Sequence, residues 1–351
     1  MRILIDLSIL KNIHCGLGQV ALNYGYFFRD EYEPVSGEEI YLLVPKLYVG
    51  AFGDKVHYIA ARKIYRIMPW LIGKRFDVWH AIHQLSRYKP FAAHYILTIH
   101  DFNFVYEKKG PKVDNYLRKI QAKADRADAI TAISEFARQE TMNYIHTDKP
   151  ISVIYNGIER IECQTEQAPK NIKQPYLFSI GELKPKKNFH VLIDMMRYLP
   201  EYELYIAGNN STPYAQEMES MIRTNNVRNV HLIGKVSAAE KNWLYQHCRA
   251  FLFPSLFEGF GLPIVEAMLF CKPVVCSHET SLIEIGNKHV TFFEKGYPAA
   301  SSAALIRSAI EKSTAQELEA AYSYATSYSW SNHMKAYLSL YRSLGSGGSQ
   351  K

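Results

Sequence analysis

Short apolar runs suited to buried strands alternate with amphipathic helical patterns along almost all of the 351 residues. This alternation constrains the fold most, because a strand, a helix and a further strand build a parallel βαβ unit. The expected strands are Arg2–Ser8, Glu39–Val44, Val56–Ile59, Val78–Ala81, Tyr95–Ile99, Ala129–Ala132, Ser152–Ile154, Tyr176–Ile180, Glu203–Ala207, Val230–Ile233, Ala250–Phe253, Pro273–Cys276 and Thr291–Phe293. The expected helices are 17–30, 61–74, 112–125, 134–144, 188–198, 213–225, 237–247 and 263–270. The pattern predicts an α/β fold with doubly wound parallel sheets.

The chain is longer than one hydrophobic core usually supports, so two domains are expected. The stretch Gln164–Pro175, rich in Gln, Lys and Pro, separates the two series of strands and is the best linker candidate. We expect one Rossmann-like domain over residues 1–165 and another over 170–327, facing each other across a cleft. Residues 328–345 have the pattern of an amphipathic helix. The Gly- and Ser-rich tail after them is left out of the fold.

The stretch Phe253–Glu266, FPSLFEGFGLPIVE, places two carboxylates around a glycine-rich turn after an apolar strand. Gly259 and Gly261 let the backbone approach a ligand, and the helix start that follows offers free N–H groups to a phosphate. Glu258 is expected before the helix and Glu266 within about its first turn. One carboxylate can then face a sugar while the other holds the hydroxyls of a ribose. Either Glu alone is explained as an acid stabilised by the helix dipole, but the whole string favours a ligand site.

A basic loop follows the strand Tyr176–Ile180 and leads into a helix. Gly181 permits a tight turn, and Lys184, Lys186 and Lys187 cluster where a diphosphate can lie. Ligands bind at the carboxyl ends of strands in open α/β sheets, so this position favours a phosphate site over an ordinary solvated loop. Lys187 is the first candidate and Lys186 the second.

Near the N-terminus, Gly16, Gly18 and Ala21 match G-x-G-x-x-A, a dinucleotide-binding fingerprint. The match is weak, because a loop of about six residues precedes it where the dinucleotide fold has an immediate turn. An NAD-dependent dehydrogenase therefore stays as an alternative, with Glu38 or Glu39 closing the first βαβ unit. That alternative leaves the two carboxylates and the lysine loop unexplained.

His100 and Asp101 end the expected strand Tyr95–Ile99 and are expected to point toward the cleft. A lone His is more often a structural residue than a catalytic one. The position at a strand end, with Asp and aromatic residues after it, nevertheless favours a place in the site. Asp101 would orient the ring or the loop.

Composition narrows the function classes. No run of about 18 apolar residues occurs, so no membrane-spanning helix is expected. The five cysteines are odd in number and not spaced as in zinc sites, which indicates reduced thiols in a cytoplasmic protein. The net charge of +7 fits an anionic partner, but the sequence has no RNA-binding motif, zinc finger or clear recognition helix. A phosphate-bearing substrate explains the charge better than nucleic acid.

Residues 62–76, RKIYRIMPWLIGKRF, interleave five basic residues with apolar and aromatic ones. Such a segment suits peripheral contact with an anionic membrane surface. It is equally explained as a helix that faces the core and has basic flanks, although Pro69 interrupts any long helix. Both interpretations stay open.

Taken together, these motifs resemble those of the retaining GT-B glycosyltransferases of family 4, also called group 1. The string from Glu258 to Glu266 is similar to the E-x7-E element of that family, and the lysine loop is similar to its G-x-x-x-P-x-K-N loop. The resemblance implies that Glu258 and His100 contact the donor sugar, that Glu266 binds the ribose and that Lys187 binds the diphosphate. It places further donor contacts at Gly16, Gly18, Gly181, Lys186, Gly208, Lys235, Val236, Gly259, Phe260, Gly261 and Leu262.

One departure concerns Glu182, which stands where many relatives have Arg. It leaves one cation fewer for the diphosphate unless Lys186 compensates. The resemblance also implies that the C-terminal helix crosses back to pack on the first domain. It further implies a Gly-rich loop around Gly16 whose backbone lies against the donor phosphate, with Gly18 and Gln19 shaping the acceptor side.

The resemblance implies a function: transfer of a hexose from a nucleotide-diphosphate sugar to a glycan or lipid-linked acceptor in cell-surface polysaccharide synthesis. No D-x-D motif occurs, so neither a metal nor a cofactor is expected. Helix dipoles, N–H groups and Lys187 would stabilise the leaving diphosphate. GDP-mannose is the first choice of donor, and UDP-sugars stay open. A non-catalytic scaffold for glycan assembly is a further alternative, which Glu182 favours slightly.

Overall fold

The computed structural model of the chain describes residues 1–13, 16–158 and 167–346. The chain divides into two compact units, Met1–Glu159 with Tyr328–Lys351, and Arg160–Ser327. The expected domain boundary at residue 165 and residues 164–166 of the expected linker lie outside the described residues, as do Cys15, Cys163 and the tail from residue 347. The two units are described separately below.

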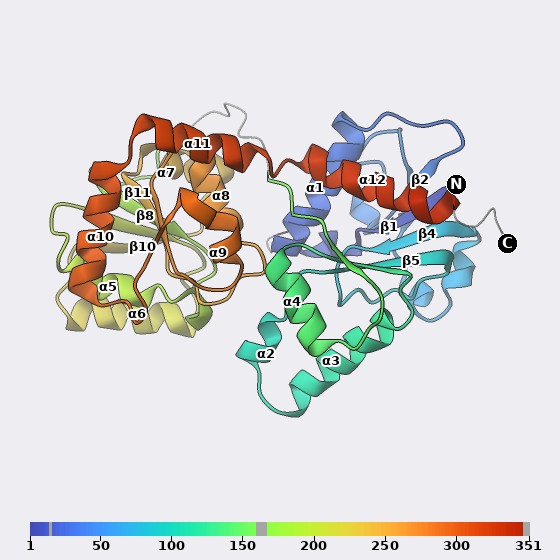
Figure 1. Cartoon of the computed structure of the whole chain (residues 1–351), viewed down its shortest axis with the longest axis horizontal. Coiled ribbons are helices and arrows are strands. Elements are labelled where there is room, and N and C mark those ends of the chain that lie inside the picture. Colours follow the sequence, from blue (N-terminus) through green and yellow to red (C-terminus); the bar gives the residue numbers. More distant parts are fainter. Residues whose placement is uncertain (14–15, 159–166, 347–351) are drawn as a thin grey trace. The chain divides into compact units, whose positions relative to one another are not determined.

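The first unit is built on a seven-stranded sheet with strand order β3-β2-β1-β4-β5-β6-β7, in which every pair of neighbours is parallel (Figure 1). Its strands are β1 (Arg2–Asp6), β2 (Glu39–Val44), β3 (His57–Ala60), β4 (Phe76–Ala81), β5 (Ala92–Ile99), β6 (Ala129–Ala132) and β7 (Ile151–Val153). The order reverses between β1 and β4, where Ile3 of β1 aligns with both Ile40 and Val78. A doubly wound sheet has its topological switch point at such a reversal.

Helices cover both faces of this sheet, which is why its strands read as nearly continuous apolar runs. The α-helices are α1 (Gly16–Asp30), α2 (Asn103–Glu107), α3 (Pro111–Ala124), α4 (Glu135–Tyr144) and α12 (Trp330–Ser346). The 3-10 helices are η1 (Ser8–Asn12), η2 (Lys46–Tyr48), η3 (Lys63–Arg66) and η4 (Pro69–Ile72). The expectation of one helix over 61–74 was wrong. Pro69 begins a second short 3-10 helix, which Gly73 ends in the left-handed region.

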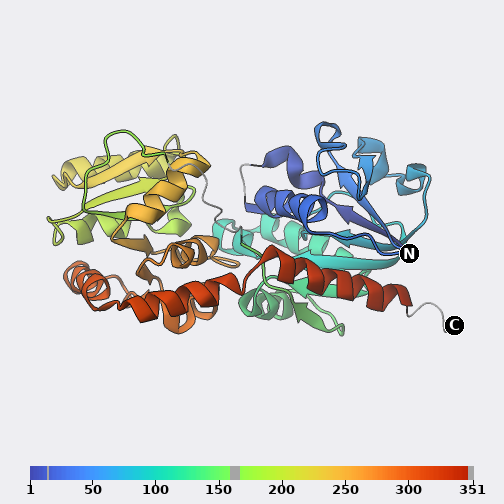
Figure 2. The same cartoon turned by 90° about the horizontal axis from the view of Figure 1, so that it is seen from above.

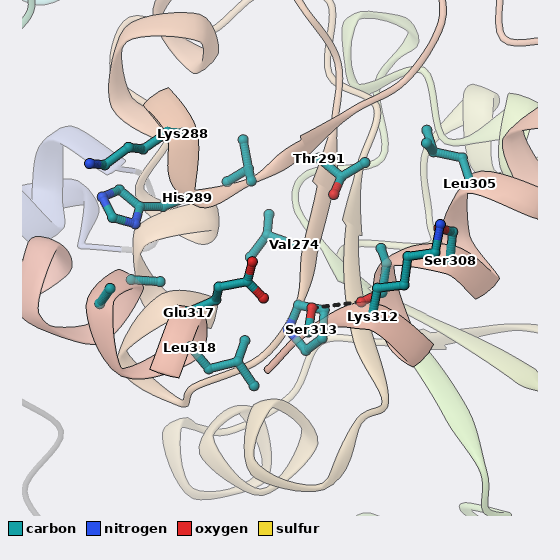
Figure 3. A pocket seen from close by; sticks show the side chains of 15 residues that line it. Val274, Lys288, His289, Thr291, Leu305, Ser308, Lys312, Ser313, Glu317 and Leu318 are labelled. Atoms are coloured by element: carbon teal, nitrogen blue, oxygen red, sulfur yellow. Dashed lines mark hydrogen bonds between the residues drawn. The ribbon is translucent and has the colours of Figure 1, made fainter. Parts of the chain in front are cut away.

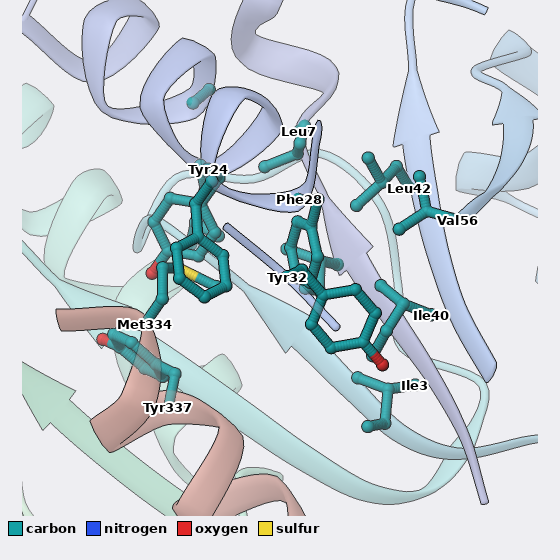
Figure 4. Packing of buried hydrophobic residues seen from close by; sticks show 14 of the residues in the cluster. Ile3, Leu7, Tyr24, Phe28, Tyr32, Ile40, Leu42, Val56, Met334 and Tyr337 are labelled. Carbon is teal, nitrogen blue, oxygen red and sulfur yellow. The ribbon is translucent and has the colours of Figure 1, made fainter. Parts of the chain in front are cut away.

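The C-terminal helix α12 returns to the first unit, as the family resemblance implied, and packs against α1 and β4 (Figures 1 and 2). Its apolar side joins the core between α1 and the sheet, where Met334 and Tyr337 lie beside Tyr24 (Figure 4). The Tyr337 hydroxyl lies 2.8 Å from the side-chain oxygens of both Thr98 and Thr131. Because these polar groups are buried, their hydrogen bonds and the apolar contacts together fix the position of α12 on the sheet.

The second unit has a six-stranded sheet with order β10-β9-β8-β11-β12-β13, again parallel throughout. Its strands are β8 (Tyr176–Ile180), β9 (Glu203–Ala207), β10 (Val230–Gly234), β11 (Ala250–Phe253), β12 (Val274–Cys276) and β13 (Thr291–Phe292). Its helices are η5 (Pro185–Lys187), α5 (His190–Met196), α6 (Pro213–Thr224), α7 (Ala238–His247), α8 (Leu262–Leu269), α9 (Ser281–Gly286), η6 (Asn287–His289), α10 (Ala299–Lys312) and α11 (Ala315–Thr326). The predicted α/β fold with two doubly wound sheets is confirmed.

Three helices of the second unit, α9, α10 and α11, were missed by the sequence analysis. A readable signal existed for α11, because Thr314 and Glu317 form a capping box at its start. Helix α10 begins after Pro298 with a run of Ala and Ser, which carries a weak apolar pattern. Its apolar side is recognisable only from what it packs on.

Candidate active site

The residues of the two strongest motifs meet at one edge of the second sheet. Lys187 follows β8 and Glu258 follows β11, and these two strands are neighbours across the point where the strand order reverses. Because all strands are parallel, the loops that follow them lie at the same carboxyl edge. Open α/β sheets bind ligands there, outside the switch point. The fold therefore brings together residues that are 71 positions apart in sequence.

Lys187 and Glu258 form an ion pair, with 2.5 Å between Lys187 Nζ and Glu258 Oε1. Both side chains are largely withdrawn from solvent, with exposed fractions of 12% and 14%. The Ser255 hydroxyl donates to the same carboxylate oxygen at 2.7 Å. The ammonium also lies 4.9 Å from the ring centroid of Phe253. The sequence predicted separate roles for the two charged residues, and the structure shows them as direct partners.

Backbone contacts hold the two loops together. Leu256 N donates to Lys186 O at 2.8 Å, so the loop after β11 is tied to the loop after β8. Glu258 N donates to Thr280 Oγ1 at 3.1 Å, and the Ser281 hydroxyl donates to Glu258 O at 2.9 Å. Thr280 has a φ of +50°, which is unfavourable for a β-branched residue and is typical of functional sites. Sequence reasoning gave no role to Ser255, although it stands in the stretch Phe253–Glu266, and it missed Thr280 and Ser281, which no motif distinguishes.

Glu266 lies in the second turn of α8, slightly later than expected. Its Oε1 pairs with Lys241 Nζ at 2.7 Å, and its Oε2 accepts a hydrogen bond from the Tyr245 hydroxyl at 2.8 Å. Burial, with the Glu266 charge as a lesser cause, raises the pKa of Tyr245, which therefore stays a neutral donor. Lys241 and Tyr245 both come from α7. They fix the orientation of the carboxylate, and neither was recognised from the sequence.

Steric clashes explain why glycine occupies two positions at this edge. Gly261 caps α8 with a φ of +100°, and a side chain there would lie 2.5 Å from Leu282 Cδ2. A side chain at Gly208 would overlap the carbonyl oxygen of Gly181. The Gly208 N–H donates to Gly234 O at 2.8 Å, so the ends of β8, β9 and β10 close on one another. Gly259 and Phe260 are buried and Leu262 is half-buried, all at the start of α8.

The remaining candidates of the second unit lie along the same edge. Lys235 is exposed and Val236 half-buried, in the connection between β10 and α7. Lys186 is half-buried on η5. Glu182 pairs with Lys184, with 3.0 Å between Glu182 Oε2 and Lys184 Nζ, and both side chains are well exposed. The departure at Glu182 therefore engages a loop lysine other than Lys187.

In the first unit, Gly16 begins α1 and is exposed, with open space where a side chain would lie. Gly18 is buried, and a side chain there would overlap the carbonyl oxygen of Asn12. The 3-10 helix η1 fills the connection between β1 and α1. This connection differs from the immediate turn of a dinucleotide fingerprint.

His100 follows β5 in the first unit and is buried. Its Nε2 lies 2.8 Å from Ile82 O, and its backbone N–H donates to Gln84 Oε1 at 3.1 Å. Burial lowers the pKa of His100 to about 4, so the ring is neutral at pH 7. Asp101 Oδ1 accepts a hydrogen bond from Asn103 N at 3.0 Å, at the start of α2. Sequence reasoning missed Gln84, which anchors the backbone of His100.

A cavity of about 470 Å³ in the second unit lies away from these residues. Lys288, His289 and Glu317 line it together with the first residues of β12 and β13 (Figure 3). It therefore opens at the amino edge of the sheet, opposite the loops that carry Lys187 and Glu258. Among the residues that the structure describes, no group of three or more His, Cys, Asp or Glu side chains is arranged to hold a metal ion.

Comparisons with known proteins agree with this geometry. The chain is 28% identical over 213 residues to the O-antigen chain mannosyltransferase B of Escherichia coli, covering 54% of each chain. It is 26% identical over 197 residues to the O-antigen chain mannosyltransferase RfbU of Salmonella typhimurium, covering 54% of this chain and 53% of the relative. The matched region thus spans about half the length of these curated relatives.

The solved structure of Anabaena HepE in complex with UDP and glucose has a similar fold, with a TM-score of 0.72 and 17% identity over 97% of this chain and 99% of that one. Residues 25–160 match the family Glycosyltransferase Family 4, and residues 161–327 match the family Glycosyl transferases group 1. The two matches together take in every strand of both sheets except β1, and they include the loops with Lys187 and Glu258. The chain therefore belongs to the group 1 and family 4 glycosyltransferases and has their GT-B fold.

Proposed function

We propose that the chain is a retaining mannosyltransferase that moves mannose from GDP-mannose to a glycan or lipid-linked acceptor in O-antigen-type polysaccharide synthesis. The observation that carries the proposal is the Lys187–Glu258 ion pair at the switch point of the second sheet. The names of the two relatives from enteric bacteria support mannose as the sugar and O-antigen as the product. With reduced thiols such as Cys248 and Cys276, the cytoplasm is the proposed compartment.

The ion pair suggests how the site handles the donor. A nucleoside diphosphate carries more negative charge than one carboxylate, so it competes with Glu258 for Lys187. When Lys187 turns to the diphosphate, Glu258 loses its partner and is available to the hydroxyls of the sugar. The N–H groups at the start of α8 add a further anion-binding element, so the proposal needs no metal or cofactor. Glu266, held by Lys241 and Tyr245, would accept hydrogen bonds from the ribose.

In the proposed transfer, the bond between the anomeric carbon and the donor phosphate oxygen breaks as the acceptor oxygen bonds to the same face of the sugar. The leaving phosphate takes the acceptor proton, which balances the charge of the step. Glu258 positions the sugar and stabilises positive charge at the anomeric carbon. His100, neutral at pH 7, would exchange a hydrogen bond with a sugar hydroxyl. Gly16 would lie against the donor phosphate, and Gly18 would shape the acceptor side.

A UDP-sugar donor is the second candidate, because the neighbouring HepE structure holds UDP and glucose. The base would be read near Lys235 and Val236, where few contacts distinguish guanine from uracil. Family membership excludes the NAD-dependent dehydrogenase. The intact pair of Lys187 and Glu258 speaks against a scaffold without activity.

The test combines binding and transfer. Thermal shifts with GDP, UDP, ADP, NAD⁺ and the matching nucleotide sugars, with and without EDTA, identify the base, since a ligand that binds only the folded state raises the Tm. We expect a shift with GDP that EDTA leaves intact and that Lys187→Ala abolishes. The matched control is Lys184→Ala, which changes an exposed lysine of the same loop paired with Glu182.

Transfer is then measured with labelled GDP-mannose and a mannose-terminated acceptor, and the anomeric configuration of the product is read by NMR. Retention of the donor configuration is the expected result, and inversion would contradict the proposed route. A shift with UDP alone would replace GDP-mannose by a UDP-sugar. No shift with any of the nucleotides would overturn the proposal.

A further inference from the structure

The segment between β3 and β4 in the first unit lies on the surface and is anchored by three buried or half-buried residues. Its two 3-10 helices, η3 and η4, are closed by hydrogen bonds such as Met68 N to Ile64 O at 2.9 Å and Gly73 N to Trp70 O at 3.0 Å. Tyr65 and Ile72 pack against the apolar core on one side of the sheet, and Pro69 is buried. Three inward residues thus fix the orientation of the rest of the segment.

The outward side of this segment is apolar to an unusual degree. The exposed fractions are 68% for Ile67, 53% for Trp70 and 50% for Leu71. Ile64 and Met68, on the same two turns, are also exposed. Single exposed apolar residues are ordinary, but five within eight positions form a patch, and such patches mark interaction sites.

The same segment carries five basic residues and no acidic one. They are Arg62, Lys63, Arg66, Lys74 and Arg75. All except Arg66 are exposed. The Arg66 guanidinium lies 5.4 Å from the ring centroid of Tyr88. Five like charges around an apolar centre oppose pairing with a second copy of this chain, and they favour an anionic partner.

The location of the patch relates it to the chemistry. The segment begins after β3 at the carboxyl edge of the sheet, where His100 follows β5, and it ends before β4 at the amino edge, where Arg75 lines one hollow with Arg2 and Asp77. The contact of Arg66 with Tyr88 joins it to the connection after β4. Gln84 of that connection holds the backbone of His100. A partner bound at the start of the segment, around Arg66, therefore meets the edge of the first unit that carries His100.

We propose that residues 62–75 dock this chain onto an anionic lipid surface. Ile67, Trp70 and Leu71 enter the boundary between headgroups and acyl chains, and the surrounding cations contact the headgroup phosphates. Trp favours this boundary because its ring is apolar and its N–H is polar. Each cation near an anionic surface strengthens binding by about fivefold, and salt weakens that contribution. The structured turns present the side chains without a folding step, unlike an amphipathic helix that forms on the membrane.

Sedimentation of the full chain with vesicles tests the proposal, with no nucleotide present. One set of vesicles is pure phosphatidylcholine. The other contains about 30% of the anionic lipid phosphatidylglycerol, so that its surface is strongly negative. We expect binding to the anionic vesicles, weaker binding to the neutral ones, and a loss of at least tenfold when salt is raised from about 0.05 to 0.5 M.

Two variants divide the contributions. The triple change Ile67→Ser, Trp70→Ser, Leu71→Ser is expected to weaken binding at least tenfold, and Arg62→Gln, Lys63→Gln, Arg75→Gln a similar amount. All six side chains are exposed, so folding is preserved and the Tm confirms it. The matched control changes Lys108, Lys109 and Lys112 to Gln, which removes the same charge from another surface of the first unit and leaves binding within twofold of wild type.

Fluorescence supplies an independent readout. Trp79 and Trp330 are buried and Trp243 is half-buried in the second unit, whereas Trp70 is half exposed. Quenching by phospholipids brominated on the acyl chains should therefore reach Trp70, and Trp70→Phe should remove most of the quenching. Equal loss in the lysine control, no binding to anionic vesicles, or a wild-type dimer that the triple serine variant makes monomeric would each overturn the proposal. None of these results depends on the sugar donor.

Discussion

The candidate site residues at the carboxyl edges of the two sheets differ in charge. In the second unit the two glutamates of the candidate site are held in ion pairs, Glu258 with Lys187 and Glu266 with Lys241. In the first unit His100 is buried and uncharged at pH 7, with a backbone carbonyl as its partner. The difference corresponds to two kinds of ligand. A diphosphate is held by cations and N–H groups, whereas sugar hydroxyls are recognised by neutral donors and acceptors.

The largest effect is expected at the ion pair of the second unit. Glu258→Gln should lower kcat by about 10²- to 10³-fold, because the charge that stabilises the transition state is lost. The same change frees Lys187, so nucleoside diphosphate binding, measured by calorimetry, should become several-fold tighter. Glu182→Gln, which alters an exposed pair in the neighbouring loop, should change kcat less than threefold. Weaker diphosphate binding in the Glu258 variant would contradict the exchange of partners.

The next largest effect is expected from adding a methyl group at a glycine of each unit. Gly208→Ala should destabilise the second unit by about 3 kcal/mol, because the new methyl group meets the backbone oxygen of Gly181, which no rotamer change relieves. Gly16→Ala, where the space is open, should leave stability within about 0.5 kcal/mol. Urea unfolding of both variants measures the difference. Equal stabilities would show that the loops after β8 and β9 can separate.

The buried histidines make the first unit sensitive to acid. Burial lowers the pKa of His100 and of His333 to about 4, below the ordinary value of 6.5. The unfolded chain therefore binds more protons between pH 6.5 and 4, and stability falls as the pH falls through this window. By pH 5 the loss is roughly 2 kcal/mol for each histidine.

Unfolding free energies at pH 7 and pH 5 measure this loss. His100→Gln should reduce the difference between the two values, whereas His146→Gln, at an exposed position, should not. A pH dependence unchanged in the His100 variant would argue against its burial as a neutral ring.

The smallest expected effect concerns the packing of the C-terminal helix α12 on the sheet. Tyr337→Phe removes a hydroxyl that Thr98 and Thr131 share, and should cost about 1 to 2 kcal/mol. The Oγ1 atoms of the two threonines lie 2.8 Å apart and keep their mutual hydrogen bond, which limits the loss of stability. Thermal unfolding gives the value, with Tyr322→Phe on the partly exposed face of α11 as the control. A drop larger than that of Gly208→Ala would mean that α12 leaves the sheet altogether.

Much of the fold was predictable, since Glu39–Val44 and Ala250–Phe253 were expected with the bounds that the structure gives them. The apolar runs of parallel strands are continuous and short, which makes them easy to recognise. The region 61–74 failed because the pattern of apolar and basic residues has a helical period while Pro69 and Gly73 break the backbone. The helical period of the apolar residues conflicted there with the low helix propensity of Pro69 and Gly73. The backbone restrictions of these two residues decided the structure.

The candidate site divides in the same way. Lys187, Glu258 and Glu266 could be proposed from sequence as candidates because glycines and strand ends surround them. Thr280 and Tyr245, which hold the two glutamates, gave no signal, because a hydrogen bond across 20 or more residues leaves no local pattern. The placement of His100 and Gly16 against a donor stays a prediction.

The sequence by itself determined the strand alternation, the doubly wound sheets and the motifs at the strand ends, because periodicity and glycine positions are local properties of the chain. Only the tertiary structure decided that Lys187 pairs with Glu258, that α12 is held by buried hydroxyls, and that Ile67, Trp70 and Leu71 face outward. These outcomes depend on which strands are neighbours and on which side of a turn meets the core. Contacts between residues far apart in the chain fix both, and no window of sequence contains them.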